Sequence, residues 1–159
     1  MIENIGALIN AAVTEVFGTM LNMQMVELPA AECVFTGQAQ IASAVGFTGQ
    51  LTGVVYLYTT TRFAGRITQG LIGLEPTELA TEEMVNDAMG EIANMVVGHF
   101  KSRLVDRGVP CVMTIPSIVR GSQFGIEAVS HTEVQRLGFQ ANGNFLLVEL
   151  LLRGGNGFR

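Results

Sequence analysis

The residues best suited to chemistry lie in one amphipathic segment, residues 81–105 of the chain. Asp87, Glu91 and Asn94 follow one another at steps of four and three residues. In an α-helix their side chains fall within about 60° of one another and form a narrow polar stripe. A carboxylate one turn from a carboxamide can bind a cationic group and hold a water molecule at a fixed geometry. The spacing therefore predicts a site that binds a partner and positions a water.

This pattern is specific because it includes Asp87 before Glu91 and Pro116 after Asn94. Glu and Asn at this spacing occur by chance in roughly one chain in three of this length. Adding Asp87, and Pro116 at twenty-two positions after Asn94, lowers that expectation to roughly one chain in a hundred. Gly98 extends the stripe by one turn and removes a side chain where a partner's backbone would approach. An ordinary solvated helix face is the alternative interpretation of these residues.

Three helices are predicted, and the longest one carries the stripe. Residues 2–21 have apolar side chains at spacings of three and four, which is typical of an amphipathic helix. Residues 61–72 are expected to form a short helix that ends at Gly73. The long helix is expected to begin at Thr81, whose side chain can cap it, and to stop at the Asp-Arg-Gly sequence 106–108.

Short β-rich segments, separated by Gly and Pro, account for most of the remaining chain. This order predicts an α+β domain in which two long helices pack on one face of a largely antiparallel sheet. We expect FLLVELLL to be a central strand or a pairing edge, and the three strands between residues 32 and 60 to form a meander. The predicted strands are ECVFT, QIASAVGFT, LTGVVYLYT, VMTI, SIVRG, FGIEAVS, TEVQRLGFQ and FLLVELLL.

The two long helices share a short pattern that is consistent with an internal duplication. Residues 6–10 (GALIN) align with residues 90–94 (GEIAN), and each helix is followed by a proline, Pro29 or Pro116. The first copy keeps the Asn but has Ala7 where the second has Glu91. Amphipathic helices resemble one another by necessity, so duplication and coincidence both stay open at this point.

Composition restricts the class of protein. One domain is expected over residues 1–153, with a flexible tail at 154–159. Only 14% of the residues are charged and the mean hydropathy is +0.40, which favours a homodimer that covers apolar surface. The net charge of −5, with nine basic residues spread along the chain, argues against a nucleic-acid partner.

The sequence also indicates a cytoplasmic protein without a metal of its own. The sequence has neither a signal-peptide start nor an apolar run long enough to span a membrane. Cys33 and Cys111 belong to no paired motif and are expected to be reduced thiols. His99 and His131 have no ligand partners at metal-binding spacing, so we expect both to be structural or exposed.

The pattern of Asp87, Glu91 and Asn94 followed by Pro116 resembles the motif of the CheC/CheX/FliY family of chemotaxis phosphatases. Chain length and element order are most similar to the CheX branch, whose members carry one such motif. In the family about twenty-two residues separate the Asn from the proline, whereas twenty-one separate Asn94 from Pro116 here. The resemblance leaves the role of Pro116 open and implies that Glu91 and Asn94 are the site residues.

The resemblance implies a phosphatase that binds the phosphorylated receiver domain of a response regulator, of the CheY type, and hydrolyses its aspartyl phosphate. Asn94 would place the attacking water, and Glu91 would pair with the receiver's active-site lysine. Asp87 and Gly98 would contact the partner, and the receiver would supply Mg²⁺. The alternatives are a non-catalytic receiver-binding adaptor, or flagellar or signalling component, of the same fold. A small ligand-sensing domain, which would need an enclosed pocket, is a third possibility.

Overall fold

The computed structural model describes residues 4–122 and 124–153. The helices have the predicted positions, and the short one has the predicted bounds. The tail predicted at 154–159 lies outside the described residues, and the limits of the single domain stay a prediction. The elements are α1 (Ile5–Leu21), β1 (Val26–Leu28), the 3-10 turn η1 (Ala30–Glu32), β2 (Ala39–Gly49), β3 (Gly53–Thr60), α2 (Thr61–Ile72), α3 (Glu82–Asp106), β4 (Cys111–Met113), β5 (Ser117–Ser122), β6 (Thr132–Ala141) and β7 (Asn144–Arg153).

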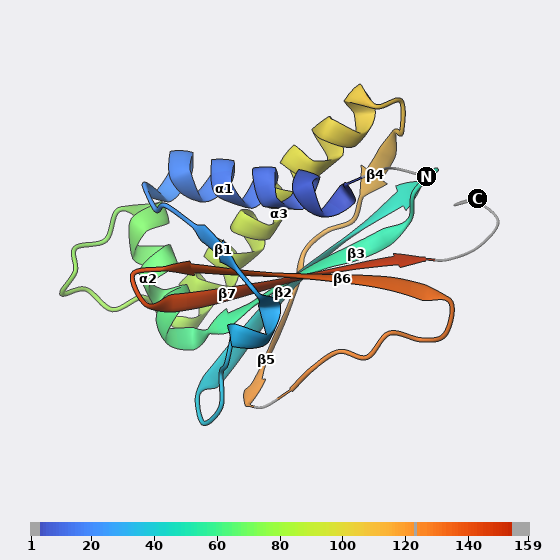
Figure 1. The fold of residues 1–159 in the computed structure, drawn as a ribbon. Coiled ribbons are helices and arrows are strands. Elements are labelled where there is room, and N and C mark those ends of the chain that lie inside the picture. Colours follow the sequence, from blue (N-terminus) through green and yellow to red (C-terminus); the bar gives the residue numbers. More distant parts are fainter. Residues whose placement is uncertain (1–3, 123, 154–159) are drawn as a thin grey trace.

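The strands form one twisted antiparallel sheet in the order β1-β6-β7-β3-β2-β4, and β5 also pairs with β2 (Figure 1). The two hairpins, β2–β3 and β6–β7, meet at the centre where β3 pairs with β7. The apolar strand FLLVELLL is thus a central strand, β7, and the alternative that it forms an edge is wrong. Its alternate side chains are buried on the helix side, which fits a strand with one face in the core.

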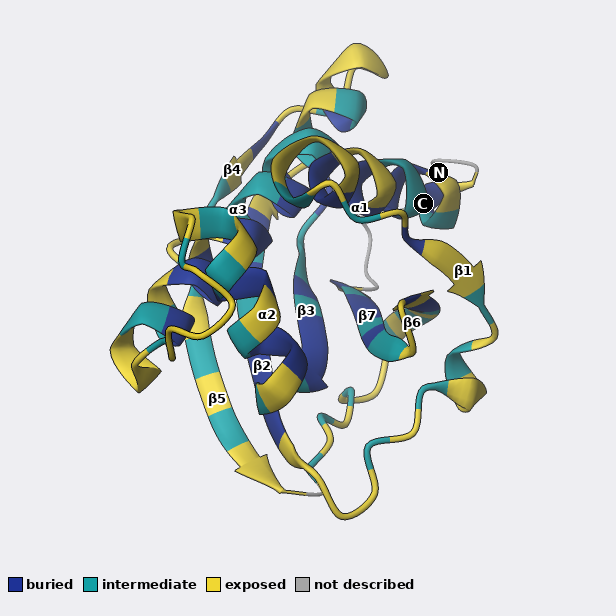
Figure 2. Cartoon of the chain, turned by 90° about the vertical axis from the view of Figure 1, so that its left-hand side faces the viewer, coloured by how far each residue is buried: buried dark blue, intermediate teal, exposed yellow. Residues whose placement is uncertain are grey.

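All three helices cover the same face of the sheet, as Figures 1 and 2 show from two directions. This confirms the α+β class and the two long helices on one face, and it adds the short α2 to that layer. Each helix turns its apolar stripe towards the strands. The inner face of α1 consists of Ile5, Leu8, Ile9, Ala12, Val13, Val16 and Phe17, and that of α3 includes Val85, Met89, Ile92, Ala93, Val96, Phe100 and Leu104.

The sheet topology has the arrangement expected of an internal duplication. Each half consists of a long helix, a short strand and a hairpin: α1, β1 and β2–β3 in one, α3, β4 and β6–β7 in the other. The short strand of each half pairs with the hairpin of the opposite half, because β1 pairs with β6 and β4 pairs with β2. The two halves therefore share one core and depend on each other for their edges.

Two predicted strands are wrong. The segment ECVFT forms no strand; the chain pairs earlier, at β1, and passes through η1, so the predicted three-stranded meander is a two-stranded hairpin. The segment FGIEAVS, residues 124–130, is irregular, although Phe124 contacts Tyr58, with ring centroids 6.0 Å apart. In each segment one apolar side chain contacts the sheet without ladder hydrogen bonds, Cys33 at the Leu146 carbonyl and Phe124 at Tyr58. Sequence alternation alone cannot distinguish such a segment from a strand.

Helix α3 has defined ends, which fix the position of its polar stripe along the axis. The Thr81 hydroxyl accepts a hydrogen bond from the Met84 backbone N–H at 3.2 Å. Glu82 and Glu83 lie in the first turn, where their charges favour the positive end of the helix dipole. Beyond the last turn Gly108 adopts a φ of 76°, a left-handed conformation that glycine tolerates well.

Phe100 anchors α3 to the sheet and provides a test of this packing. Its side chain is fully buried, and its ring centroid lies 5.5 Å from that of Phe47 on β2 in an edge-to-face arrangement. The substitution Phe100→Ala should lower the free energy of unfolding by about 3–5 kcal/mol, because it leaves a cavity in the shared core. Val105→Ala on the exposed side should change it by less than about 0.5 kcal/mol. Urea unfolding measures both; equal effects would contradict this packing.

Candidate functional site

The predicted polar stripe lies on the outer side of α3. Asp87 and Glu91 are exposed, whereas Asn94 and Gly98 are partly exposed. The positions between them are buried, apart from the partly exposed Met95, so the stripe lies on the side of the helix that the core leaves uncovered. The structure therefore places all four predicted site residues on one accessible surface.

The side chains of this stripe make no hydrogen bond to another described residue. The contacts that hold α3 in place come from its flanks instead. Arg120 on β5 donates to Asn86 Oδ1 at 2.8 Å and to the Glu82 carbonyl at 3.3 Å. Because the flanks are anchored and the stripe is not engaged, the Asn94 carboxamide is available to a water and to a partner.

A second anchor joins α3 to α1. The Arg103 guanidinium lies 2.8 Å from Glu15 Oε2, and His99 Nδ1 lies 3.5 Å from the same oxygen. The hydrogen bond from Arg103, together with the neighbouring His99 imidazole, holds the pKa of the Glu15 carboxyl below its usual value. His99 is thus a structural residue on the surface, in agreement with prediction, and His131 is exposed at the start of β6.

Pro116 packs against α3 at Gly90, and this contact gives the proline a structural role. A Cβ added to Gly90 would lie 3.4 Å from Pro116 Cγ and 3.6 Å from its Cβ. Gly90 directly precedes Glu91 and lies one turn before Asn94, so the ring braces the helix beside both site residues. The sequence pattern aligns Gly90 with Gly6 but does not predict that Gly90 contacts Pro116.

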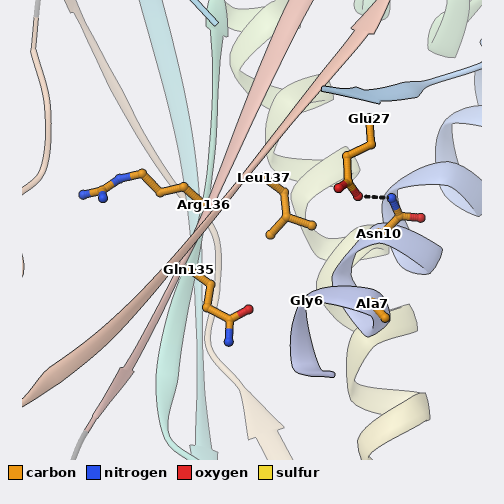
Figure 3. Close-up of a pocket in the computed structure, with 7 residues that line it drawn as sticks. All are labelled: Gly6, Ala7, Asn10, Glu27, Gln135, Arg136 and Leu137. Atoms are coloured by element: carbon orange, nitrogen blue, oxygen red, sulfur yellow. Dashed lines mark hydrogen bonds between the residues drawn. The ribbon is translucent and has the colours of Figure 1, made fainter. Parts of the chain in front are cut away.

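The equivalent region of α1 is closed to the same chemistry (Figure 3). There the Asn10 side-chain amide donates a hydrogen bond to Glu27 Oε1, from β1. These two residues line a surface pocket with Gly6, Ala7, Gln135 and Leu137. Ala7 provides no carboxylate, and the Asn10 amide already has a protein partner. The first half of the chain therefore has a similar arrangement without the free groups of α3.

Over the described residues, few other side chains are placed for metal binding or nucleophilic catalysis. There, no group of three or more His, Cys, Asp or Glu side chains is placed to hold a metal ion. Burial raises the pKa of both the Cys33 and the Cys111 thiols, so each stays protonated and poorly reactive at neutral pH. Among the described helices, none combines the length and apolar character needed to cross a membrane.

A family model described as "Chemotaxis phosphatase CheX" matches residues 41–140. This match spans more than half of the chain, and the chain belongs to the CheX family of chemotaxis phosphatases. A search of the curated proteins found no match.

Solved structures share the fold over almost the whole chain. The chemotaxis protein CheX from Desulfovibrio desulfuricans is 23% identical, with a TM-score of 0.78 over 94% of this chain and 99% of that one. CheX from Vibrio vulnificus is 22% identical, with a TM-score of 0.80 over 94% and 97%. The Borrelia burgdorferi CheX-CheY-BeF3-Mg complex contains a chain 20% identical, with a TM-score of 0.77 over 94% and 98%. At these identities the likeness shows the fold.

The contact between Gly90 and Pro116 predicts opposite effects for two substitutions. Gly90→Ala should raise the free energy of unfolding by up to about 1 kcal/mol, because the methyl group fits at contact distance and alanine favours a helix. Gly90→Leu should lower it by about 1–3 kcal/mol, because the larger side chain must displace the proline ring. Thermal unfolding measures both. A Leu variant as stable as the Ala variant would show that Pro116 does not pack there.

Proposed function

We propose that this phosphatase hydrolyses the aspartyl phosphate of a CheY-type receiver domain, and that Glu91 and Asn94 carry the reaction. The supporting observation is the accessible, unengaged carboxamide of Asn94 one turn from the exposed carboxylate of Glu91, on a helix braced from three sides. A site on a convex helix suits a reaction whose substrate is itself a protein surface. An enclosed pocket, which a small-molecule sensor would need, is not required.

Asn94 acts by placing one water molecule. Its carboxamide oxygen accepts a hydrogen bond from the water, and its amide group donates to a phosphoryl oxygen. The water attacks phosphorus in line, the bond from phosphorus to the aspartyl oxygen breaks, and inorganic phosphate and a free carboxylate leave. Phosphoryl transfer through a loose transition state needs little covalent help, so positioning is sufficient. A hundredfold acceleration corresponds to about 2.7 kcal/mol of barrier lowering.

Glu91 acts by docking. An exposed carboxylate at this position can pair with the active-site lysine of the receiver and fix the partner's register against the helix. Asp87, one turn earlier, adds a second negative charge to this contact. Gly98, one turn after Asn94, leaves open space: a Cβ added there would meet no described atom within 4 Å. The partner's backbone can therefore approach the helix closely at that turn.

The receiver, in this proposal, brings its own Mg²⁺. The Borrelia burgdorferi complex pairs CheX with CheY, BeF3 and Mg, and a receiver in that state is the partner expected here. This chain contributes no cofactor of its own to the proposed reaction. The cytoplasm is the expected compartment, because response-regulator receivers act there.

A homodimer also belongs to the proposal, since the low charge content favours covered apolar surface. Because β7 is central, pairing would use an outer strand, such as β1 or β5, in place of FLLVELLL. Sedimentation equilibrium of the chain measures this; a monomer at micromolar concentration would exclude a stable dimer.

The substitution Asn94→Ala tests the proposed reaction. It should abolish the accelerated decay of a phosphorylated CheY-type receiver while leaving binding of the BeF3-treated receiver within about threefold, because the carboxamide acts on the water more than on docking. Decay of the labelled acyl phosphate with Mg²⁺ present measures the rate, and calorimetric titration measures binding.

Asn10→Ala is the matched control, since it removes the same group from α1. It should leave the rate unchanged, because Asn10 is bonded to Glu27 and faces no receiver in the proposal. Acceleration that survives Asn94→Ala would reject the assignment of this residue. Receiver binding without acceleration by the wild-type protein would favour the adaptor function instead.

Gly98→Ala separates stability from partner contact. The substitution should raise the free energy of unfolding by about 1 kcal/mol, because alanine is the better helix former and the site has room for a methyl group. It should also raise the KM for the phosphorylated receiver several-fold with little change in kcat, because the methyl group occupies the space of the partner's backbone. Unfolding in urea and initial rates measure these values; an unchanged KM would remove Gly98 from the docking surface.

A further inference from the structure

Arg120 connects β5 to the first two turns of α3, the helix that carries the polar stripe. It pairs in register with Ile41, which is fully buried, so its side chain leaves the sheet on the helix side. Its Nε donates a hydrogen bond to Asn86 Oδ1 at 2.8 Å, and a second guanidinium nitrogen donates to the Glu82 carbonyl at 3.3 Å. The side chain of Arg120 is 27% exposed, so water competes little with these two bonds.

Asn86 begins a row of residues that leads along α3 to the proposed catalytic group. Asn86, Gly90 and Asn94 follow one another at steps of four residues, and each step turns by about 40° around the helix axis. The row therefore starts against β5 and reaches the outer side of α3 at Asn94. Arg120 holds the first member of the row, and Pro116, directly before β5, packs at the second. The Asn94 carboxamide lies one turn beyond these two contacts.

The polar contacts of α3 fix its rotation more closely than its apolar face does. Figure 2 shows the helix between α1 and the edge of the sheet formed by β4 and β5. Apolar packing decides which side of α3 faces inward, but it is non-directional and leaves the last degrees of rotation open. Hydrogen bonds depend on direction as well as distance. On the α1 side the partner of Arg103 is Glu15, whose side chain is 46% exposed, which weakens that contact. The better shielded bonds of Arg120 are therefore the closer restraint.

A small rotation of α3 is enough to displace the Asn94 carboxamide. Side-chain ends lie about 5–6 Å from the axis of an α-helix, so a rotation of about 10° moves them by about 1 Å. A displacement of this size lowers the rate of a reaction that depends on positioning by up to about a hundredfold. The attraction between Glu91 and a cationic group changes slowly with distance, so docking tolerates the same displacement.

We propose that Arg120 is a positioning residue of the phosphatase: through Asn86 and the Glu82 carbonyl it fixes the rotation of α3, and thereby the place of the Asn94 carboxamide. This inference rests on the proposed function. Arg120 acts on the reaction through the helix and not through the receiver. Its loss therefore lowers kcat and leaves docking nearly unchanged, whereas loss of a docking residue changes KM.

The first test is Arg120→Met, which keeps the aliphatic stem of the side chain and removes both hydrogen bonds. The probe is a CheY-type receiver, phosphorylated with acetyl phosphate and Mg²⁺ for rates and treated with BeF3 for binding. The value of kcat should fall at least tenfold, while KM and Kd stay within threefold. The control is Arg62→Met on α2. Arg62 is exposed, lines the same surface groove as Arg120 and makes no side-chain hydrogen bond to another described residue, so each value should stay within twofold.

Asn86 provides a second test, from the other side of the same bond. Asn86→Ala removes the acceptor and should lower kcat at least fivefold, whereas Asn86→Asp keeps an acceptor for Arg120 and should hold kcat within twofold of the wild-type value. The double variant Arg120→Met with Asn86→Ala should be no slower than Arg120→Met alone, because both changes remove one interaction. Two losses that multiply would show that the residues act separately and would overturn the inference.

The side-chain amide signal of Asn94 in a ¹H–¹⁵N NMR spectrum reports on the carboxamide without any receiver. Arg120→Met should shift or broaden this signal, which is assigned by its loss in Asn94→Ala, and Arg62→Met should leave it in place. An unchanged signal, an unchanged kcat, or a rise in KM as large as the fall in kcat overturns the positioning role while leaving the phosphatase function in place. A wild-type protein that dephosphorylates no receiver overturns the proposed function itself.

Discussion

The burial of one face of α3 is the constraint on which the rest of the structure depends. The helix has 25 residues, ten of them buried, and it contacts α1, α2 and the sheet along its length. Because the apolar residues of α3 face the core, the residues on the opposite side of the helix face solvent. Packing of the core therefore sets which side of α3 carries the polar stripe. Phe100 and Leu104 at one end and the Thr81 cap at the other fix the helix in rotation and in translation. The role proposed for Asn94, placing a water, needs that rigidity, because an unfixed carboxamide would lose the geometry that catalysis by positioning requires.

The two halves of the fold are arranged alike, but of the two long helices it is α3 that presents an unengaged carboxylate and carboxamide. Both long helices pack on the shared sheet with the same order of short strand and hairpin behind them. Their surfaces differ by two local interactions. On α3, Pro116 packs at Gly90 and leaves Asn94 free, whereas on α1 Glu27 accepts the hydrogen bond of Asn10. A carboxamide that is satisfied inside its own chain has little to offer a water or a phosphoryl oxygen, so α1 acts as a structural counterpart of α3.

The open character of the site matches the chemistry of a phosphatase that acts on another protein. In the proposed reaction the phosphoryl group belongs to the partner, so this chain needs only a rigid, accessible ridge. Family membership and the local geometry agree in this respect: the family model describes a chemotaxis phosphatase, and the residues of the stripe are arranged to be approached from outside.

The sequence by itself determined the helices, the long strands β2, β3, β6 and β7 and the polar stripe, because periodicity, caps and glycine stops are local signals. Helix α2 follows its predicted bounds, and Asp87, Glu91 and Asn94 share one face because 3.6 residues make a turn. Only the tertiary structure decided the remaining features. Residues far apart in the chain are joined by the pairing of β1 with β6, by the contact of Pro116 with Gly90, and by the hydrogen bond between Asn10 and Glu27. Arg62 and Arg120, also far apart in the chain, line the same groove. Such contacts depend on which faces the shared core buries, and no local pattern encodes that choice.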